Sequence, residues 1–142
     1  MPTHPRLVNT VLDATDAREL AEFYRRLLGL EYRPGDEPGA DGEEVPDWLV
    51  LVTPAGRRLL AFQRVETLHR TTWPSPDVPM QMHLCFSVDE PGDLDAQRER
   101  AESLGARLLL HRTDEPDEPL YVLADPAGHP FCLYTHPSGR LD

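Results

Sequence analysis

The sequence has no lysine, and its 14 basic residues, all arginines, are outnumbered by 25 acidic ones. The formal net charge of −11 excludes a broad basic surface of the kind that nucleic-acid phosphates require, so we expect no nucleic-acid partner. Many of the acids fall in two short segments, residues 36–47 and 114–118, which we interpret as solvated loops.

Cysteine is scarce, and long apolar runs are missing. The two cysteines, Cys85 and Cys132, match neither a zinc finger nor a redox motif. No run is long enough to cross a membrane, and residues 1–6 lack an apolar signal region. We therefore expect a cytoplasmic protein with reduced cysteines and no membrane partner. A chain of 142 residues can form one domain with its own core.

The chain contains an internal repeat with a period near half its length. Thr-Pro-Ala-Gly at 53–56 returns as Asp-Pro-Ala-Gly at 125–128, an offset of 72 (125 − 53 = 72). Two further pairs keep a similar offset, Gly29 with Gly105 and Asn9 with His83. A repeat of this size indicates two similar modules, because a solenoid needs three or more shorter units. The space between two such modules is where a binding site is expected.

Hydrophobic periodicity predicts the same order of elements in each half, namely strand, helix and three strands. In the first half we expect strands at 7–12, 30–33, 48–52 and 58–64, with a helix from an N-cap at Asp16 to Gly29. In the second half we expect strands at 82–88, 107–112, 120–123 and 130–135, with a helix from Asp93 to Gly105. The halves are thus two βαβββ modules, 7–66 and 80–136, joined by a proline-rich linker at 67–79.

Three motifs occur in a specific order along the chain. They are Phe23-Tyr24-x-x-Leu27-Leu28-Gly29 at a helix end, the strand His83-Leu84-Cys85-Phe86-Ser87-Val88-Asp89, and the turn Asp125-Pro126-Ala127-Gly128-His129. Together they resemble the vicinal oxygen chelate superfamily, which includes glyoxalase I, extradiol dioxygenases and bleomycin-resistance proteins. The segment Phe62-Gln63-Arg64-Val65-Glu66 followed by Trp73-Pro74 is similar to a glyoxalase-like subgroup common in high-GC bacteria.

This resemblance implies an α+β fold. Two tandem βαβββ modules would form a half-open eight-stranded barrel around a cleft, within a single glyoxalase-like domain spanning 1–142. It also implies a homodimer, since members of the superfamily commonly pair and the sheet edges can be covered by a neighbour.

Metal-dependent members of the superfamily place ligands at four equivalent points, on the first and last strand of each module. In this chain the resemblance puts these points at Asn9, Leu60, His83 and Cys132. Only His83 is a standard ligand of the family, whereas a catalytic metal needs about three protein ligands. We therefore expect no family-type metal and no other cofactor.

An atypical metal site is the alternative. His83 and Cys85 share one face of their strand, and Cys85 would lie near Cys132. These three residues form a donor set that a divalent zinc or copper ion tolerates. The competing interpretation is that both cysteines are small buried packing residues.

Alternation along the strands predicts a mostly apolar cleft with a few polar groups, as in a small-molecule pocket. Its predicted ligand-binding residues are Asn9, Phe62, Gln81, His83, Cys132 and Tyr134, with Trp73 as an aromatic wall or a linker anchor. His83 is interpreted either as a structural strand residue or as a neutral imidazole that binds a ligand or passes a proton.

Two functions follow from this site. The favoured one is a small-molecule binding protein of the glyoxalase/bleomycin-resistance type without a catalytic metal. The alternative is a lyase or dioxygenase-type enzyme of the superfamily, with an atypical metal site or with His83 as acid/base.

Overall fold

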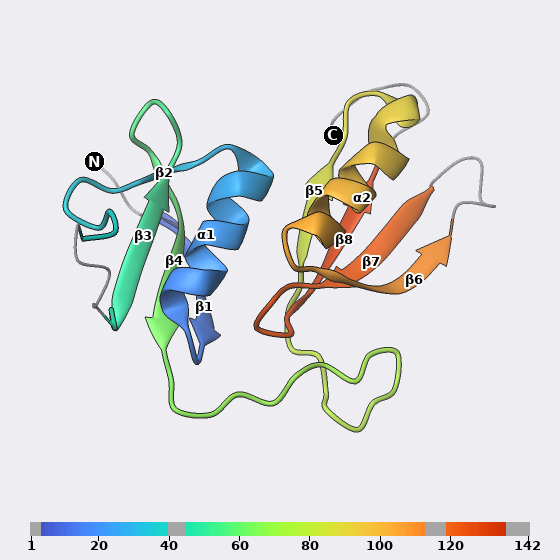
Figure 1. Ribbon diagram of the computed structural model, residues 1–142, viewed down its shortest axis with the longest axis horizontal. Helices are drawn as coiled ribbons and strands as arrows, with labels where there is room; N and C mark the ends of the chain where they lie inside the picture. Colours follow the sequence, from blue (N-terminus) through green and yellow to red (C-terminus); the bar gives the residue numbers. More distant parts are fainter. Residues whose placement is uncertain (1–3, 40–44, 113–118, 136–142) are drawn as a thin grey trace. The chain divides into compact units, whose positions relative to one another are not determined.

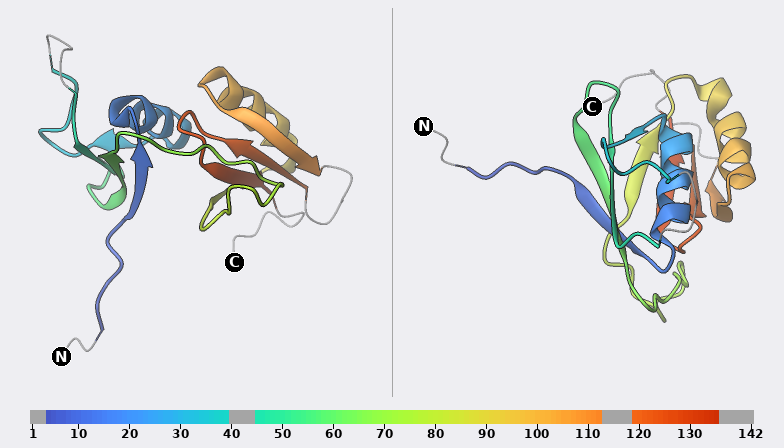
Figure 2. Two further views of the ribbon diagram at one scale, coloured as in Figure 1. Left: turned by 90° about the horizontal axis from the view of Figure 1, so that it is seen from below. Right: turned by 60° about the vertical axis from the view of Figure 1, so that its left-hand side comes forward.

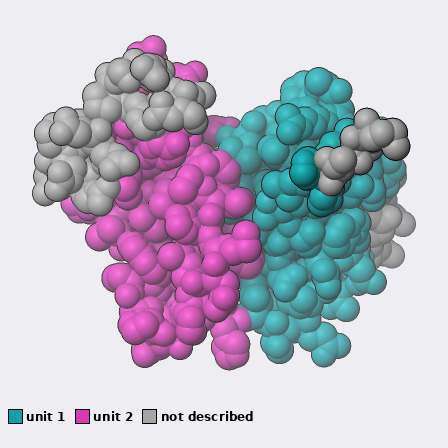
Figure 3. All heavy atoms as spheres, turned by 180° about the vertical axis from the view of Figure 1, so that it is seen from behind, with its two compact units in different colours: residues 1–68 teal, residues 69–142 magenta. Residues whose placement is uncertain are grey.

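The computed structural model describes residues 4–39, 45–112 and 119–135 (Figure 1). The chain divides into two compact units, Met1–Leu68 and His69–Asp142, which Figure 3 shows in different colours. Their boundary falls inside the linker predicted at 67–79. Much of both acidic segments, and the predicted end of the second module at residue 136, lie outside the described residues.

The first unit is a βαβββ module. It contains, in order, β1 (Thr10–Ala14), α1 (Ala17–Leu28), β2 (Glu31–Tyr32), β3 (Trp48–Val52) and β4 (Arg58–Arg64). Its four strands form one sheet in the order β1-β4-β3-β2, in which β1 runs parallel to β4 and the other pairs are antiparallel.

The second unit repeats this arrangement. It contains β5 (Leu84–Ser87), a short 3-10 turn (Pro91–Asp93), α2 (Leu94–Ser103), β6 (Arg107–Arg112), β7 (Leu120–Ala124) and β8 (Pro130–Tyr134). The sheet order is β5-β8-β7-β6, with β5 parallel to β8. The α+β class and the two tandem modules are therefore confirmed, as two four-stranded sheets. The enclosure of a cleft by all eight strands and the single-domain organisation stay predictions.

Local signals in the sequence set the ends of α1. The Asp16 side chain accepts a hydrogen bond from the Glu19 N–H at 3.0 Å, which satisfies one of the unpaired donors of the first turn. At the other end Gly29 has a φ of 67°, a left-handed conformation that favours glycine, and its N–H donates to the Arg25 carbonyl. In α2, by contrast, the Asp93 side chain makes no cap hydrogen bond, and its backbone (φ −93°, ψ −4°) is helical instead of extended as at a usual N-cap.

Each helix lies across one face of its own sheet (Figures 1 and 2). In the first unit Tyr24 of α1 stacks on Phe62 of β4, with ring centroids 6.0 Å apart and both side chains fully buried. In the second unit Phe131 and Leu133 of β8 are buried, and Phe131 contacts the ring of Phe86. Burying an apolar side chain of this size contributes about 1.5–3 kcal/mol, so the packing of each helix on its sheet stabilises the core of its unit.

The repeated turns have the same hydrogen bonds in both units. Thr53 and Asp125 each donate their backbone N–H to the carbonyl four residues ahead, at 2.7 and 2.8 Å. Each also accepts a bond of 2.8 Å from the N–H of the turn glycine, Gly56 or Gly128. The sequence repeat is therefore a structural repeat.

The first strand of each module is shorter than expected. The predicted strands at 7–12 and 82–88 are observed as Thr10–Ala14 and Leu84–Ser87. Thr10 pairs with Leu60, near the start of β4, so residues before Thr10 have little of that strand left to pair with. Within the described part of the chain, no helix is long and apolar enough to span a membrane.

Candidate functional site

The face of the second sheet that points away from α2 carries three of the predicted residues. Cys85 pairs directly with Cys132 across β5 and β8. The next pair along, Phe86 and Leu133, points to the opposite face because side chains alternate along a strand. His83 precedes Cys85 by two residues, so we place its side chain on the same face as both cysteines.

The donor atoms of these three side chains form a close group. The His83 ring nitrogen and the two Sγ atoms all lie within 4.8 Å of one another. His83 and Cys85 are exposed, Cys132 is half-buried, and both cysteines are thiols rather than partners in a disulfide. The structure thus brings together the three residues that the sequence pointed to as an atypical metal site.

Apolar side chains flank this group on the same face. Val122 pairs with Cys132 and is buried, and Leu110 pairs with Val122 and is 39 % exposed. Tyr134, two residues beyond Cys132, pairs with Ser87 and is half-buried. A few polar groups beside apolar surface is the usual composition of a small-molecule site.

Three other predicted residues, Asn9, Gln81 and Trp73, lie outside the regular strands. Asn9 immediately precedes β1, as His83 immediately precedes β5, so the predicted equivalence of these two positions is confirmed. Gln81 is exposed, two residues before His83. Trp73 is half-buried in the segment between β4 and β5, where its backbone N–H donates to Thr71 Oγ1 at 3.0 Å.

Phe62 differs from the sequence prediction, which placed it on the same face as Asn9. Its fully buried ring stacks on Tyr24, so it faces α1. The cause is a β-bulge, since Leu51 pairs with Leu60 but Val52 pairs with Arg58, which leaves Leu59 as an extra residue. One extra residue moves every later side chain of the strand to the other face.

The bulge also changes which residue is equivalent to Cys132. In the parallel pair of the first sheet Val11 lies beside Ala61, as Cys85 lies beside Cys132 in the second. Ala61 rather than Leu60 therefore occupies the ligand point of β4. Ala61 belongs to a buried apolar cluster with Val50 and Val52. At the positions of the two cysteines the first sheet is thus apolar.

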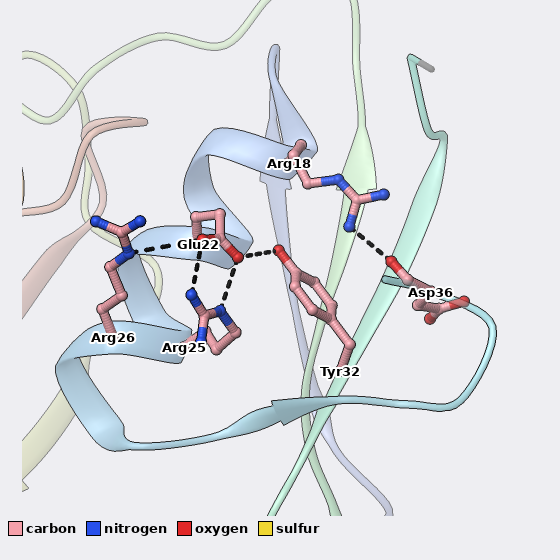
Figure 4. Close-up of polar contacts among 6 residues, drawn as sticks. All are labelled: Arg18, Glu22, Arg25, Arg26, Tyr32 and Asp36. Atoms are coloured by element: carbon pink, nitrogen blue, oxygen red, sulfur yellow. Dashed lines mark hydrogen bonds and ion pairs between the residues drawn. The ribbon is translucent and has the colours of Figure 1, made fainter. Parts of the chain in front are cut away.

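A second polar cluster, on α1 and β2, was not predicted (Figure 4). Arg25 holds the Glu22 carboxylate through two hydrogen bonds of 2.7 and 2.9 Å, and Arg26 lies 3.6 Å from it. The Tyr32 hydroxyl donates to the same carboxylate at 2.6 Å. The i,i+3 and i,i+4 spacing of Glu22 with Arg25 and Arg26 can be read from the sequence. The contact with Tyr32 cannot, because it forms only when β2 folds beside α1.

The contacts in this cluster keep Glu22 ionised and Tyr32 protonated at neutral pH. The hydrogen bond from Arg25 is the main reason that the pKa of Glu22 falls to about 2. Burial, with the hydrogen bond to Glu22, raises the pKa of Tyr32 to about 12. Neither group exchanges a proton near neutral pH, where an acid/base catalyst must. We interpret the cluster as a structural connection between α1 and β2.

An open hollow of about 300 Å³ lies beside this cluster in the first unit. It is lined by residues that include Arg18, Asp36 and Trp48. The Arg18 guanidinium donates to the Asp36 carbonyl at 2.6 Å and lies 5.0 Å from the centre of the Tyr32 ring (Figure 4). This hollow is the alternative location for a ligand.

The fold is shared with solved structures of low sequence identity. A glyoxalase/bleomycin resistance protein/dioxygenase family enzyme from Burkholderia phytofirmans is 17 % identical with a TM-score of 0.64, over 91 % of this chain and 97 % of that one. The fosfomycin resistance protein FosX from Listeria monocytogenes is 16 % identical with a TM-score of 0.65, over 98 % and 100 % of the two chains. A protein from Agrobacterium tumefaciens is 21 % identical with a TM-score of 0.64, over 95 % and 98 %.

The family is shown by a sequence model. No curated protein sequence matches the chain. The family model of the glyoxalase-like domain matches residues 9–134, which include both modules and the His83, Cys85 and Cys132 group. The chain therefore belongs to the glyoxalase-like domain family, within the vicinal oxygen chelate superfamily.

Proposed function

We propose that this protein binds a small, partly apolar molecule on the face of the second sheet that carries His83, Cys85, Cys132 and Tyr134. The observation that carries the proposal is the grouping of an imidazole and two thiols beside apolar Val122 and Leu110 on that face. The imidazole and the Tyr134 hydroxyl supply hydrogen bonds, and the apolar side chains supply contact area.

The proposed binding does not use a hard divalent ion of the family type. The four ligand points carry Asn9, Ala61, His83 and Cys132, and none of these is a carboxylate. A FosX from L. monocytogenes has been crystallised with Mn(II), an ion that prefers oxygen ligands. One amide oxygen is the only such side-chain donor at the four points of this chain.

The ligand class is to be tested with compounds related to the structural neighbours. Two structural neighbours are described as a fosfomycin resistance protein and as a member of a glyoxalase/bleomycin resistance protein/dioxygenase family, so fosfomycin and bleomycin are the first two probes. A library of small aromatic and polar molecules follows. The measurement is the shift in melting temperature of the full chain. A probe that stabilises the protein in a saturable way supports the proposal.

The contribution of His83 is tested by His83→Ala. Because His83 is exposed, we expect folding to be retained while ligand binding weakens by about 1–3 kcal/mol, the cost of a lost hydrogen bond that the ligand would cover. The matched control is His111→Ala, an exposed histidine of β6 that pairs with Tyr121 and so faces the other side of the sheet. Equal effects of the two variants, or unfolding of His83→Ala with no ligand found, would refute the proposal.

The alternative function is a lyase or dioxygenase-type enzyme, with an atypical metal site or His83 as acid/base. The close group of His83, Cys85 and Cys132 is the observation that favours it. Turnover of a bound probe that His83→Ala abolishes would support this alternative over simple binding.

We further propose that the protein acts in the cytoplasm as a homodimer. β6 and β2 are edge strands of their sheets, and an edge strand offers hydrogen-bonding groups that a second copy can cover. Light scattering at micromolar concentration should give the mass of two chains, and a strictly monomeric mass would refute the dimer.

A further inference from the structure

Backbone pairing, rather than a loop, holds two sulfur donors side by side in the second unit. Cys85 and Cys132 are partners in the parallel β5–β8 register. His83 adds a nitrogen donor from the residue just before β5. All three belong to the same compact unit, so the donor set is complete within one module.

The spacing of the donors suits a tetrahedral metal ion. With Zn–S distances near 2.3 Å and Zn–N distances near 2.0–2.1 Å, a nitrogen and two sulfur donors in tetrahedral positions lie about 3.5–3.8 Å apart. The three donor atoms lie within 4.8 Å of one another, which exceeds the largest of these spacings by at most about 1 Å. Two thiolates and a neutral imidazole are soft or borderline ligands, which suit zinc and copper better than manganese or magnesium.

The exposure of the cysteines argues against a packing role. A small residue that only fills the core is buried, whereas Cys85 is exposed and Cys132 is half-buried. The same exposure gives an ion access to the donors. At the equivalent positions of the first sheet, Val11 and Ala61 cannot bind a metal.

We propose that His83, Cys85 and Cys132 bind a thiophilic metal ion, Zn²⁺ being the probe, in a site contained in the second module. Two thiolates neutralise the charge of the ion, and three protein ligands leave a fourth position open. This site differs from the family arrangement, which uses both modules. It goes beyond the proposed ligand binding, because the ion is bound by the chain itself without any organic molecule.

The test uses the full chain, reduced and stripped of metal, with no organic ligand present. Zn²⁺ is titrated in competition with a chromogenic chelator, and Co²⁺ is added separately to record its spectrum. We expect one ion per chain, a thiolate-to-cobalt charge-transfer band with the intensity of two thiolates, and protection of both thiols from iodoacetamide.

Variants assign the ligands. Cys85→Ser, Cys132→Ser and His83→Gln should each lower zinc affinity more than about 100-fold, since loss of an outer partner alone costs about 10–100-fold. Each serine variant should also halve the charge-transfer band. The matched control His111→Gln changes a histidine on the other face of the same sheet and should leave both measurements unchanged.

Three results would overturn the proposal. They are zinc affinity that is unaffected by both serine variants, thiols that stay reactive at saturating zinc, and reduced wild-type protein that does not compete with the chelator. If a variant fails to fold, thiol protection in the wild-type protein still decides. Because no organic molecule is present, failure of the metal site leaves the ligand-binding proposal to be judged by its own titrations.

Discussion

Cys85 and Cys132 are direct neighbours across the parallel strands β5 and β8. The equivalent neighbours in the first module are Val11 and Ala61, which offer no polar group. The two modules share their strand order and turns, yet they differ at this pair. The chemistry that we propose for the protein therefore resides in the second copy of the repeat.

The placement of Phe62 predicts a stability effect. Phe62→Ala should lower the free energy of unfolding by about 3–5 kcal/mol, because it removes a fully buried ring from the layer under α1. Leu59→Ala is the control, since the bulge residue Leu59 is 40 % exposed and should change stability far less. Urea denaturation measures both. A small loss for Phe62→Ala together with weakened ligand binding would instead place Phe62 in the binding site.

The two turn glycines provide a matched pair. Gly56 and Gly128 have φ values of 89° and 98°, so alanine at either costs about 1–2 kcal/mol in backbone strain. At Gly128 a Cβ would also lie 2.9 Å from the Arg70 Cβ, whereas at Gly56 no atom of the described residues would lie within 4 Å of it. Gly128→Ala should thus cost about 1–3 kcal/mol more than Gly56→Ala. Equal unfolding free energies of the two variants would show that Arg70 does not pack on this turn.

Glu22 should make the free energy of unfolding depend on pH in the acidic range. Its pKa is lowered from 4.5 to about 2, so its stabilisation is fully present above pH 4.5 and is lost as the pH falls through about 2. Glu22→Gln should lower the unfolding free energy by about 1 kcal/mol at neutral pH, a modest value because both partners are partly exposed. Denaturation from pH 7 to pH 2 should show the difference from wild type shrinking with acid. A difference that stays constant would contradict this account, and Glu31→Gln, an exposed change on β2, is the control.

Patterns contained in a few neighbouring residues were sufficient to predict much of the fold. The bounds of β3, β4 and β6 agree with the predicted strands at 48–52, 58–64 and 107–112. The cap at Asp16 and the helix end at Gly29 were also predicted correctly, because each depends on local hydrogen bonds.

The register was predicted correctly only where the strands pair without a bulge. The expected ligand points Leu60 and Cys132 each lie four residues after a turn glycine, Gly56 or Gly128. Such a count assumes two identical hairpins, but the bulge at Leu59 adds one residue to the first. That residue moves Phe62 to the α1 face. The second hairpin pairs without interruption from Ala124 to Leu120, so the same count gave the observed face for Cys132 and Tyr134.

The measurement that most directly tests the proposed site is chemical-shift mapping by NMR. The ¹⁵N-labelled full chain is titrated with whichever probe raises its melting temperature. Our account predicts the largest amide shifts at residues 83–87 and 131–134, with little change around Arg18, Asp36 and Trp48. The largest shifts around that hollow of the first unit, with β5 and β8 unperturbed, would contradict the account.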